Sequence, residues 1–135
     1  MNKTELIELA ASVRKRAYTP YSGFAVGAAL EAKSGNVYLG CNVENASFGI
    51  TSCAERNALF AAIAAGEREF RRIAIVGAKA DEALQAPCMP CGACRQALLE
   101  FCEEDFEWIT YDGVEARSFS MAELMPHTFI LKAEE

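Results

Sequence analysis

The sequence predicts an α/β fold with three layers (α/β/α), in which helices cover both faces of one mixed sheet of five strands. Two observations predict it. First, apolar residues follow a helical period in some segments and form short runs typical of strands in others, in the order α-β-β-α-β-α-β-β-α. Second, this order combines a hairpin with a β-α-β crossover, which requires antiparallel and parallel neighbours in the same sheet. A chain of 135 residues can bury its own core, so residues 1–135 are expected to form a single domain.

The first elements are a helix and a β-hairpin. Residues 2–18 carry apolar positions at helical spacing, and Asn2 with Glu5 resembles a capping box at the helix start. Residues 24–32 and 37–43 are apolar runs, and the Lys-Ser-Gly-Asn segment between them is typical of a turn.

Helices and strands alternate in the rest of the chain. Cys53–Ala65 is rich in alanine and is followed by Gly66, the usual residue just beyond a helix. Cys91–Cys102 is helical in pattern, and Pro90 precedes it. The remaining runs predict strands at 72–78, 107–111 and 114–119 and a short helix at 121–124.

The composition limits the partners of this chain. The net charge is −6 at pH 7 and the basic residues are scattered, so nucleic acid would be repelled. The N-terminus does not resemble a secretory signal, and no apolar run is long enough to span a membrane, so we expect a soluble, cytoplasmic protein. Hydrophobic residues make up 52% of the chain, which predicts apolar surface that other subunits cover.

Three cysteines at two predicted helix starts indicate the chemistry. Cys53 begins the segment Cys-Ala-Glu, and Cys91 and Cys94 lie in Pro-Cys-Gly-Ala-Cys-Arg-Gln. Helix N-termini stabilise thiolates, and thiolates are ligands for Zn²⁺. Three ligands leave the fourth corner of the zinc tetrahedron for water, which is the arrangement of catalytic sites. The sequence therefore predicts one Zn²⁺ and hydrolysis by a metal-activated water.

Charged residues beside these cysteines fit the same chemistry. By itself, Glu55 would be an ordinary carboxylate in a first helical turn. Beside Cys53 in an otherwise apolar helix, it is predicted to move the protons of the bound water. Three thiolates give the zinc site a charge of about −1, which a nearby cation would offset. Arg56 is the first candidate for that cation, and Arg95 is the second.

Cys88 leaves a second interpretation of the metal site open. Together with Cys53, Cys91 and Cys94 it would complete a closed, four-thiolate structural zinc site. Against this, Pro90 favours an extended backbone before the helix and is expected to direct Cys88 away from the helix start.

Four motifs in a specific order cover nearly the whole chain. They are the cysteine segments at 53–55 and 90–96, Tyr-Ser-Gly-Phe-Ala-Val-Gly-Ala-Ala-Leu at 21–30, Asn-Val-Glu-Asn-Ala-Ser at 42–47, and Glu-Leu-Met-Pro at 123–126 followed by Phe129. Together they resemble the cytidine deaminase family in its short, single-domain form. The resemblance implies that Cys53, Cys91 and Cys94 bind one Zn²⁺ per subunit and that Glu55 is the proton shuttle, not a ligand.

The resemblance also implies a nucleoside substrate and its contacts. Asn42 and Glu44 would hydrogen-bond the ribose hydroxyls, and Phe24 would pack against the base or sugar. The backbone at Ala54 would hold the pyrimidine carbonyl. Phe129 would stack on the base across a subunit boundary, because the short family members are typically homotetramers.

The implied reaction is the hydrolytic deamination of cytidine and 2′-deoxycytidine to uridine and 2′-deoxyuridine, with release of ammonia. The resemblance also implies that Phe48 contacts the substrate. The family often has Tyr there, and this chain lacks that hydroxyl. Two alternatives stay open: a deaminase of another aminopyrimidine nucleoside of the blasticidin type, and a non-catalytic structural zinc module.

Overall fold

The structure is a computed structural model that describes residues 1–131, and in this range the chain forms one sheet of five strands. The strands are β1 (Phe24–Ala32), β2 (Val37–Cys41), β3 (Phe70–Lys79), β4 (Glu107–Tyr111) and β5 (Ala116–Ser120), and their order in the sheet is β2-β1-β3-β4-β5. β3 and β4 are parallel, whereas the other neighbouring pairs are antiparallel. The predicted mixed five-stranded sheet is confirmed.

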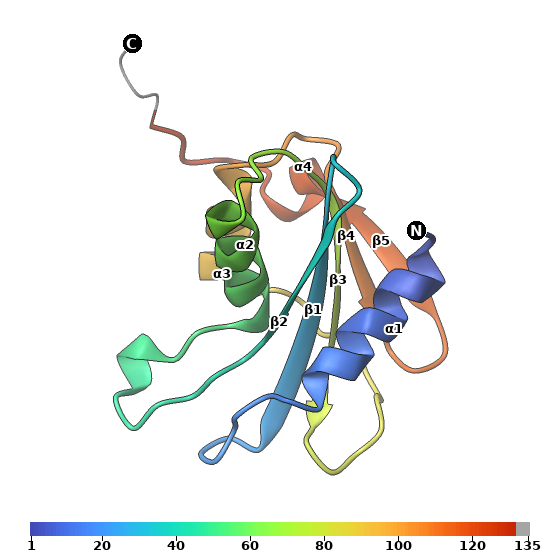
Figure 1. Cartoon of the computed structure of the whole chain (residues 1–135), viewed down its shortest axis with the longest axis vertical. Helices are drawn as coiled ribbons and strands as arrows, with labels where there is room; N and C mark the ends of the chain where they lie inside the picture. The colour runs from blue at the N-terminus through green and yellow to red at the C-terminus, as the bar shows by residue number, and fades with distance from the viewer. Residues whose placement is uncertain (132–135) are drawn as a thin grey trace.

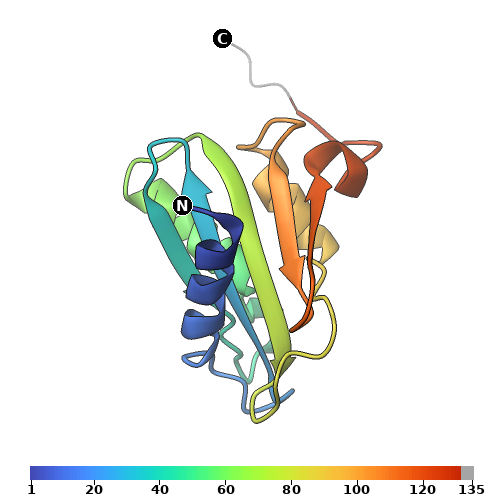
Figure 2. The same cartoon turned by 90° about the vertical axis from the view of Figure 1, so that its right-hand side faces the viewer.

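Helices cover both faces of this sheet (Figures 1 and 2). They are α1 (Lys3–Arg14), α2 (Ala54–Ala64), α3 (Gly92–Leu99) and α4 (Met121–Leu124), with a 3-10 turn η1 at Phe48–Ile50. α1 lies on one face, and α2, α3 and α4 lie on the other. Among residues 1–131, none of the helices has the length and apolar character needed to span a membrane.

Alternate residues of the sheet feed two hydrophobic cores. In β3, Ile73 and Ile75 pack in the core under α2 and α3, whereas Ala74 and Val76 pack with Leu6 of α1. This alternation follows from the two-residue period of a strand. Because both faces are buried, the three-layer prediction is confirmed.

The topology brings the starts of α2 and α3 together. β2 and β3 both run antiparallel to β1, so they run parallel to each other and their carboxyl ends lie at the same end of the sheet. α2 follows β2, and α3 follows β3. Both helices therefore begin just beyond the carboxyl ends of these strands, where a ligand site is expected in a sheet of this kind.

The first helix ends earlier than its apolar period predicts. α1 begins with Asn2 as its N-cap, as expected, but it ends at Arg14 and not at residue 18. The Tyr18 N–H donates to the Asn42 carbonyl oxygen at 3.0 Å, which draws the chain toward the end of β2. Elsewhere the predicted strands 24–32 and 107–111 are confirmed at both ends, and the helix predicted for 91–102 ends at Leu99.

Candidate metal centre

Three cysteine sulfurs meet where α2 and α3 begin. Cys53 is the N-cap of α2, Cys91 is the N-cap of α3, and Cys94 lies in the first turn of α3. The Cys53 and Cys91 sulfurs are 4.0 Å apart, the Cys91 and Cys94 sulfurs are 3.5 Å apart, and all three lie within 4.8 Å of one another. A tetrahedral zinc with Zn–S bonds of about 2.3 Å separates its sulfurs by about 3.8 Å. The donor set therefore fits Zn²⁺.

Hydrogen bonds and charge favour a thiolate at this point. The pKa of Cys53 is lowered to about 5, chiefly by a hydrogen bond from Cys94 and then by the Arg56 guanidinium. The Arg56 Nη2 donates to the Cys53 sulfur at 3.3 Å. The Cys94 thiol donates a hydrogen bond to the Cys53 thiolate. This bond, and then burial, raise the pKa of Cys94. Arg56 therefore occupies the place expected of the compensating cation.

Arg95, the second candidate cation, has a different role. Its Nε donates to the Pro90 carbonyl oxygen at 3.0 Å, and its Nη1 donates to the Leu124 carbonyl oxygen at 3.1 Å. It therefore fixes the backbone just before Cys91 and ties α3 to α4.

Glu55 is buried beside the sulfurs, with 4% of its surface exposed. Burial raises the pKa of its carboxyl group, and the neighbouring Cys53 thiolate raises it further. Glu55 and Cys53 line the same cavity of about 160 Å³. A carboxyl group whose pKa is shifted toward neutrality can both accept and donate protons, as general acid–base catalysis requires.

This cavity, which we call the zinc pocket, is open to a small ligand. It is lined by Val26, Asn42, Thr51, Ser52, Cys53, Ala54, Glu55, Cys88, Met89 and Cys91. A second hollow of about 380 Å³ adjoins it through Thr51 and contains Glu44 and Phe48. The predicted contacts Asn42 and Ala54 line the zinc pocket, and Glu44 and Phe48 line the second hollow, with Thr51 in the wall of both.

Cys88 lies in the wall of the zinc pocket, outside the sulfur cluster. Among residues 1–131, the group of candidate metal ligands contains Cys53, Cys91 and Cys94 without Cys88. A Cβ atom added to Gly77 of β3 would lie 2.8 Å from the Cys88 sulfur, so this thiol packs directly on β3. Burial raises the pKa of Cys88 to about 12, which disfavours the thiolate that zinc binding needs. The geometry therefore favours the open three-sulfur site.

Asn42 and Glu44 are held rigidly by backbone groups. The Asn42 side chain accepts from the Val26 N–H at 2.8 Å and donates to the Phe24 carbonyl oxygen at 2.8 Å. Glu44 accepts from the N–H groups of Tyr21 and Ser22 at 3.0 and 3.1 Å and from the Ser22 hydroxyl. An amide oxygen and a carboxylate each have further lone pairs, so both side chains keep capacity for a ligand.

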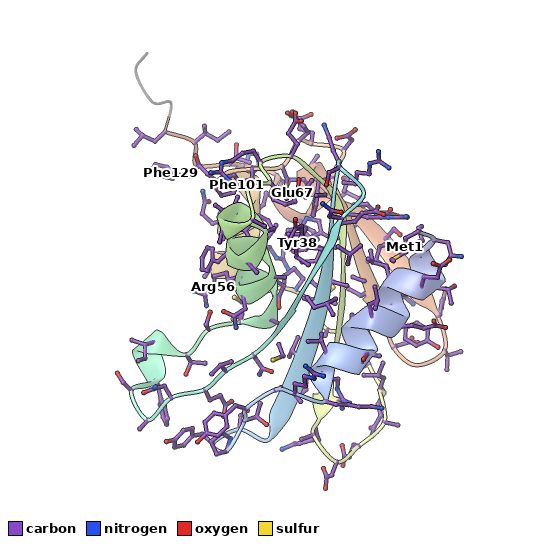
Figure 3. All side chains as sticks on the ribbon, viewed as in Figure 1. Met1, Tyr38, Arg56, Glu67, Phe101 and Phe129 are labelled. Atoms are coloured by element: carbon purple, nitrogen blue, oxygen red, sulfur yellow. The ribbon has the colours of Figure 1, made fainter. Side chains whose placement is uncertain are left out.

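The aromatic residues lie at different distances from the pocket. Phe24 is 40% exposed and lines a hollow on the Gly77 side. Phe48 contacts Tyr21 edge to face, with the ring centroids 5.4 Å apart. Phe129 lies beyond the carboxyl end of α2, whereas Arg56 lies near its amino end (Figure 3). Phe129 thus does not line the zinc pocket of its own subunit.

Sequence reasoning missed the residues that hold the site in place. Tyr21 and Ser22 fix Glu44, and Asn57 bonds to Cys41, next to Asn42, and to Ser52, next to Cys53. The bonds to Glu44 and to Cys41 join segments 16 to 23 residues apart, so no local pattern indicates them.

Comparison with known proteins identifies the family. Residues 1–110 match the family model for the cytidine and deoxycytidylate deaminase zinc-binding region. The chain belongs to this family. Cytidine deaminase from Halalkalibacterium halodurans is 45% identical over 132 residues, which is 96% of this chain and 95% of that protein. Cytidine deaminase from Sporosarcina psychrophila is 42% identical over 130 residues, covering 96% of this chain and 92% of that protein.

Solved structures of the family have the same fold. The crystal structure of cytidine deaminase from Burkholderia pseudomallei superposes with a TM-score of 0.87 at 47% identity, covering 96% of this chain and all of that chain. The crystal structure of cytidine deaminase from Mycobacterium tuberculosis superposes with a TM-score of 0.80 at 36% identity, covering 97% of this chain and 99% of that chain. The family's zinc-binding region and the cluster of Cys53, Cys91 and Cys94 together support one zinc per subunit.

Proposed function

We propose that this family member hydrolyses cytidine and 2′-deoxycytidine to uridine and 2′-deoxyuridine, with release of ammonia. One observation carries the proposal: three sulfurs spaced for zinc lie beside the buried carboxylate Glu55, in a pocket that is open to a small molecule. Three protein ligands leave one position of a tetrahedral zinc for water, as hydrolysis requires. A structural zinc module would need a fourth protein ligand, and Cys88 is outside the cluster.

Cys53, Cys91 and Cys94 hold the zinc. When bound there, zinc acts as a Lewis acid that lowers the pKa of water and makes it a nucleophile. Glu55 accepts a proton from the attacking water and gives it to N3 of the pyrimidine ring. It then carries the second proton of that water to the amino group at C4. The C4–N bond breaks, ammonia leaves, and the water oxygen becomes the new carbonyl oxygen.

We assign the two hollows, which share Thr51, to the two halves of a nucleoside. The base occupies the zinc pocket, where the backbone of Ala54 binds the pyrimidine carbonyl. Phe24 lines a separate hollow and packs against the ligand from outside this pocket. The sugar extends from the zinc pocket toward the second hollow, and its hydroxyls bind Asn42 in the pocket and Glu44 in the second hollow. Both side chains are fixed before substrate arrives, so little conformational entropy is lost on binding.

The protein assembles as a homotetramer in this proposal. Large apolar side chains are exposed on the surface near the site, including Phe48 (70% exposed), Ile50 (66%) and Phe60 (54%). Exposed apolar surface of this kind is typical of subunit contacts. Because Phe129 lies away from its own zinc pocket, we assign it, together with Phe48, to a site at the subunit boundary.

Other properties follow from charge and cysteine chemistry. A net charge of −6 disfavours nucleic acid, and a free nucleoside needs no phosphate-binding groove. All six cysteines are free, which suits the reducing cytoplasm. We assign the whole chain to one catalytic domain that needs neither a membrane nor a nucleic-acid partner.

Metal removal tests this function directly. The protein is expected to convert cytidine to uridine, followed by the change in ultraviolet absorbance, and to lose this activity after exhaustive treatment with a zinc chelator. Stoichiometric Zn²⁺ should restore the rate, because zinc supplies the nucleophile. A panel with 2′-deoxycytidine and blasticidin S defines the substrate. Full activity of a demonstrably metal-free protein, or no release of ammonia from any nucleoside, would contradict the proposal.

A further inference from the structure

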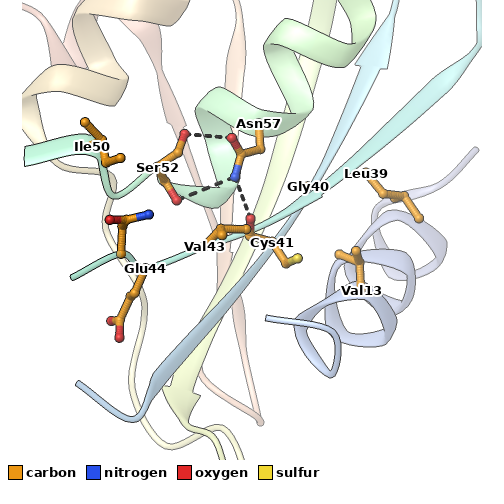
Figure 4. Close-up of a pocket in the computed structure, with 10 residues that line it drawn as sticks. Val13, Leu39, Gly40, Cys41, Val43, Glu44, Ile50, Ser52 and Asn57 are labelled. Atoms are coloured by element: carbon orange, nitrogen blue, oxygen red, sulfur yellow. Dashed lines mark hydrogen bonds between the residues drawn. The ribbon is translucent and has the colours of Figure 1, made fainter. Parts of the chain in front are cut away.

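Asn57, in the first turns of α2, connects the segments that carry the metal ligand Cys53 and the proposed sugar ligand Asn42. Its Nδ2 donates to the Cys41 carbonyl oxygen at 2.7 Å. Its Oδ1 accepts from the Ser52 hydroxyl at 2.6 Å, and its Nδ2 makes a longer bond of 3.5 Å to the Ser52 carbonyl oxygen; Figure 4 shows all three bonds. Cys41 immediately precedes Asn42, and Ser52 immediately precedes Cys53. One amide therefore links the segment that precedes Asn42 to the segment that precedes Cys53.

This amide extends a short ladder along the outer edge of the sheet. β2 is an edge strand, and beyond its end Val43 exchanges two backbone hydrogen bonds of 3.0 Å with Ser52. Asn42, between Cys41 and Val43, directs its N–H to β1 instead. Residues 41 and 43 therefore both face the outer edge, since alternate residues of a strand point the same way. Asn57 supplies to the Cys41 carbonyl the donor that a neighbouring strand would provide.

Close packing of α2 on β2 fixes the length of this connection. A Cβ atom added to Gly40 would lie 2.3 Å from the Ala54 carbonyl oxygen and 2.5 Å from the Ala58 nitrogen. The helix thus rests on the bare backbone of the strand. At this separation the short side chain of Asn57 spans the gap. Asn57 also lines a groove of about 490 Å³ together with Leu39 and Ser52.

We infer that Asn57 is a positioning residue for substrate binding. It fixes the position of Asn42 relative to the metal ligand Cys53. The inference rests on the proposed function. Asn57 does not line the zinc pocket, so it acts through Asn42 and not on the reacting atoms. Its loss should weaken nucleoside binding while the three sulfurs, which begin two separate helices, keep their metal.

The test is the substitution Asn57→Asp in the full chain loaded with zinc. Aspartate can still accept from the Ser52 hydroxyl, but it cannot donate to the carbonyl oxygens of Cys41 and Ser52, and its second carboxylate oxygen repels the Cys41 carbonyl oxygen. The KM for cytidine is expected to rise at least about ten-fold, because Asn42 moves with Cys41. The kcat should change less than about three-fold, and zinc should remain at one per subunit. Both are measured beside the wild type, by kinetics and by metal analysis.

A double-mutant cycle with Asn42→Ala separates positioning from general stability. If Asn57 acts through Asn42, then Asn57→Asp should change KM less than about two-fold once Asn42 is already alanine. If the aspartate variant does not fold, Ser52→Ala replaces it in the test. This substitution removes the hydroxyl that holds the Asn57 amide, so the amide can rotate. The KM of this variant is expected to rise about two- to three-fold, and this rise too should disappear in the Asn42→Ala background.

The inference is overturned by an unchanged KM in the folded variants, by equal KM increases in both backgrounds, or by loss of zinc from Asn57→Asp. A wild-type protein that does not deaminate cytidine overturns the proposed function itself. The wild-type assay therefore comes first and distinguishes the two failures.

Discussion

Replacing Glu55 by Gln is expected to reduce kcat for cytidine by about 10⁴-fold and to leave one zinc per subunit. Gln has nearly the same size and fills the same buried position, which is 4% exposed. It cannot take a proton from water or deliver one to the ring and the leaving amine. Steady-state kinetics and metal analysis on the same sample measure both quantities.

Glu31→Gln is the matched control for this experiment. Glu31 is equally buried, at 3% exposed. It lies near the carboxyl end of β1, at the end of the sheet opposite to the metal centre, and pairs with Arg72. Breaking this buried pair should lower the melting temperature, while kcat per folded subunit stays within about two-fold of the wild type. A Glu55→Gln protein with near-normal kcat would show that another group moves the protons.

Cys94→Ala is expected to abolish both zinc binding and turnover. Cys94 is completely buried, and two remaining thiolates cannot hold zinc in a site built from three. Metal analysis after dialysis should find less than about one zinc per ten subunits, and cytidine deamination should fall below detection.

The matched control is Cys102→Ala, which removes a half-buried thiol that packs against the core under α2 and α3. Among residues 1–131, Cys102 lies outside the candidate metal group. This variant should keep its zinc and its kcat/KM. Stoichiometric zinc in the Cys94→Ala protein would disprove the assignment of Cys94 as a ligand.

The fold and the metal centre could be predicted from the sequence because both depend on local signals. The apolar periods identify the strands, and Gly66, with a φ of 100°, ends α2 where the sequence predicts. Cys53 and Cys91 each precede a helix, so a parallel arrangement of β2 and β3 suffices to bring them together. The position of Arg56 next to Cys53 follows from its place in the same helical turn.

The parts that could not be predicted depend on contacts between distant segments. After α1 ends, the chain turns so that Tyr18 bonds to Asn42, and this long-range contact cannot be read from the apolar positions of the helix. The role of Asn57 depends on the approach of α2 to Gly40, which is known only once the helix is placed on the sheet. The substrate roles proposed for Phe48 and Phe129 require a subunit boundary, which a local pattern in one chain does not indicate.

Zinc X-ray absorption on the metal-loaded protein tests the central claim most directly. Three cysteine sulfurs at two helix starts should appear as three sulfur neighbours at about 2.3 Å, with one oxygen or nitrogen neighbour at about 2.0 Å. The same spectrum is expected from Cys88→Ala, because that sulfur lies outside the cluster. Four sulfur neighbours in the wild type, falling to three in Cys88→Ala, would contradict an open catalytic zinc.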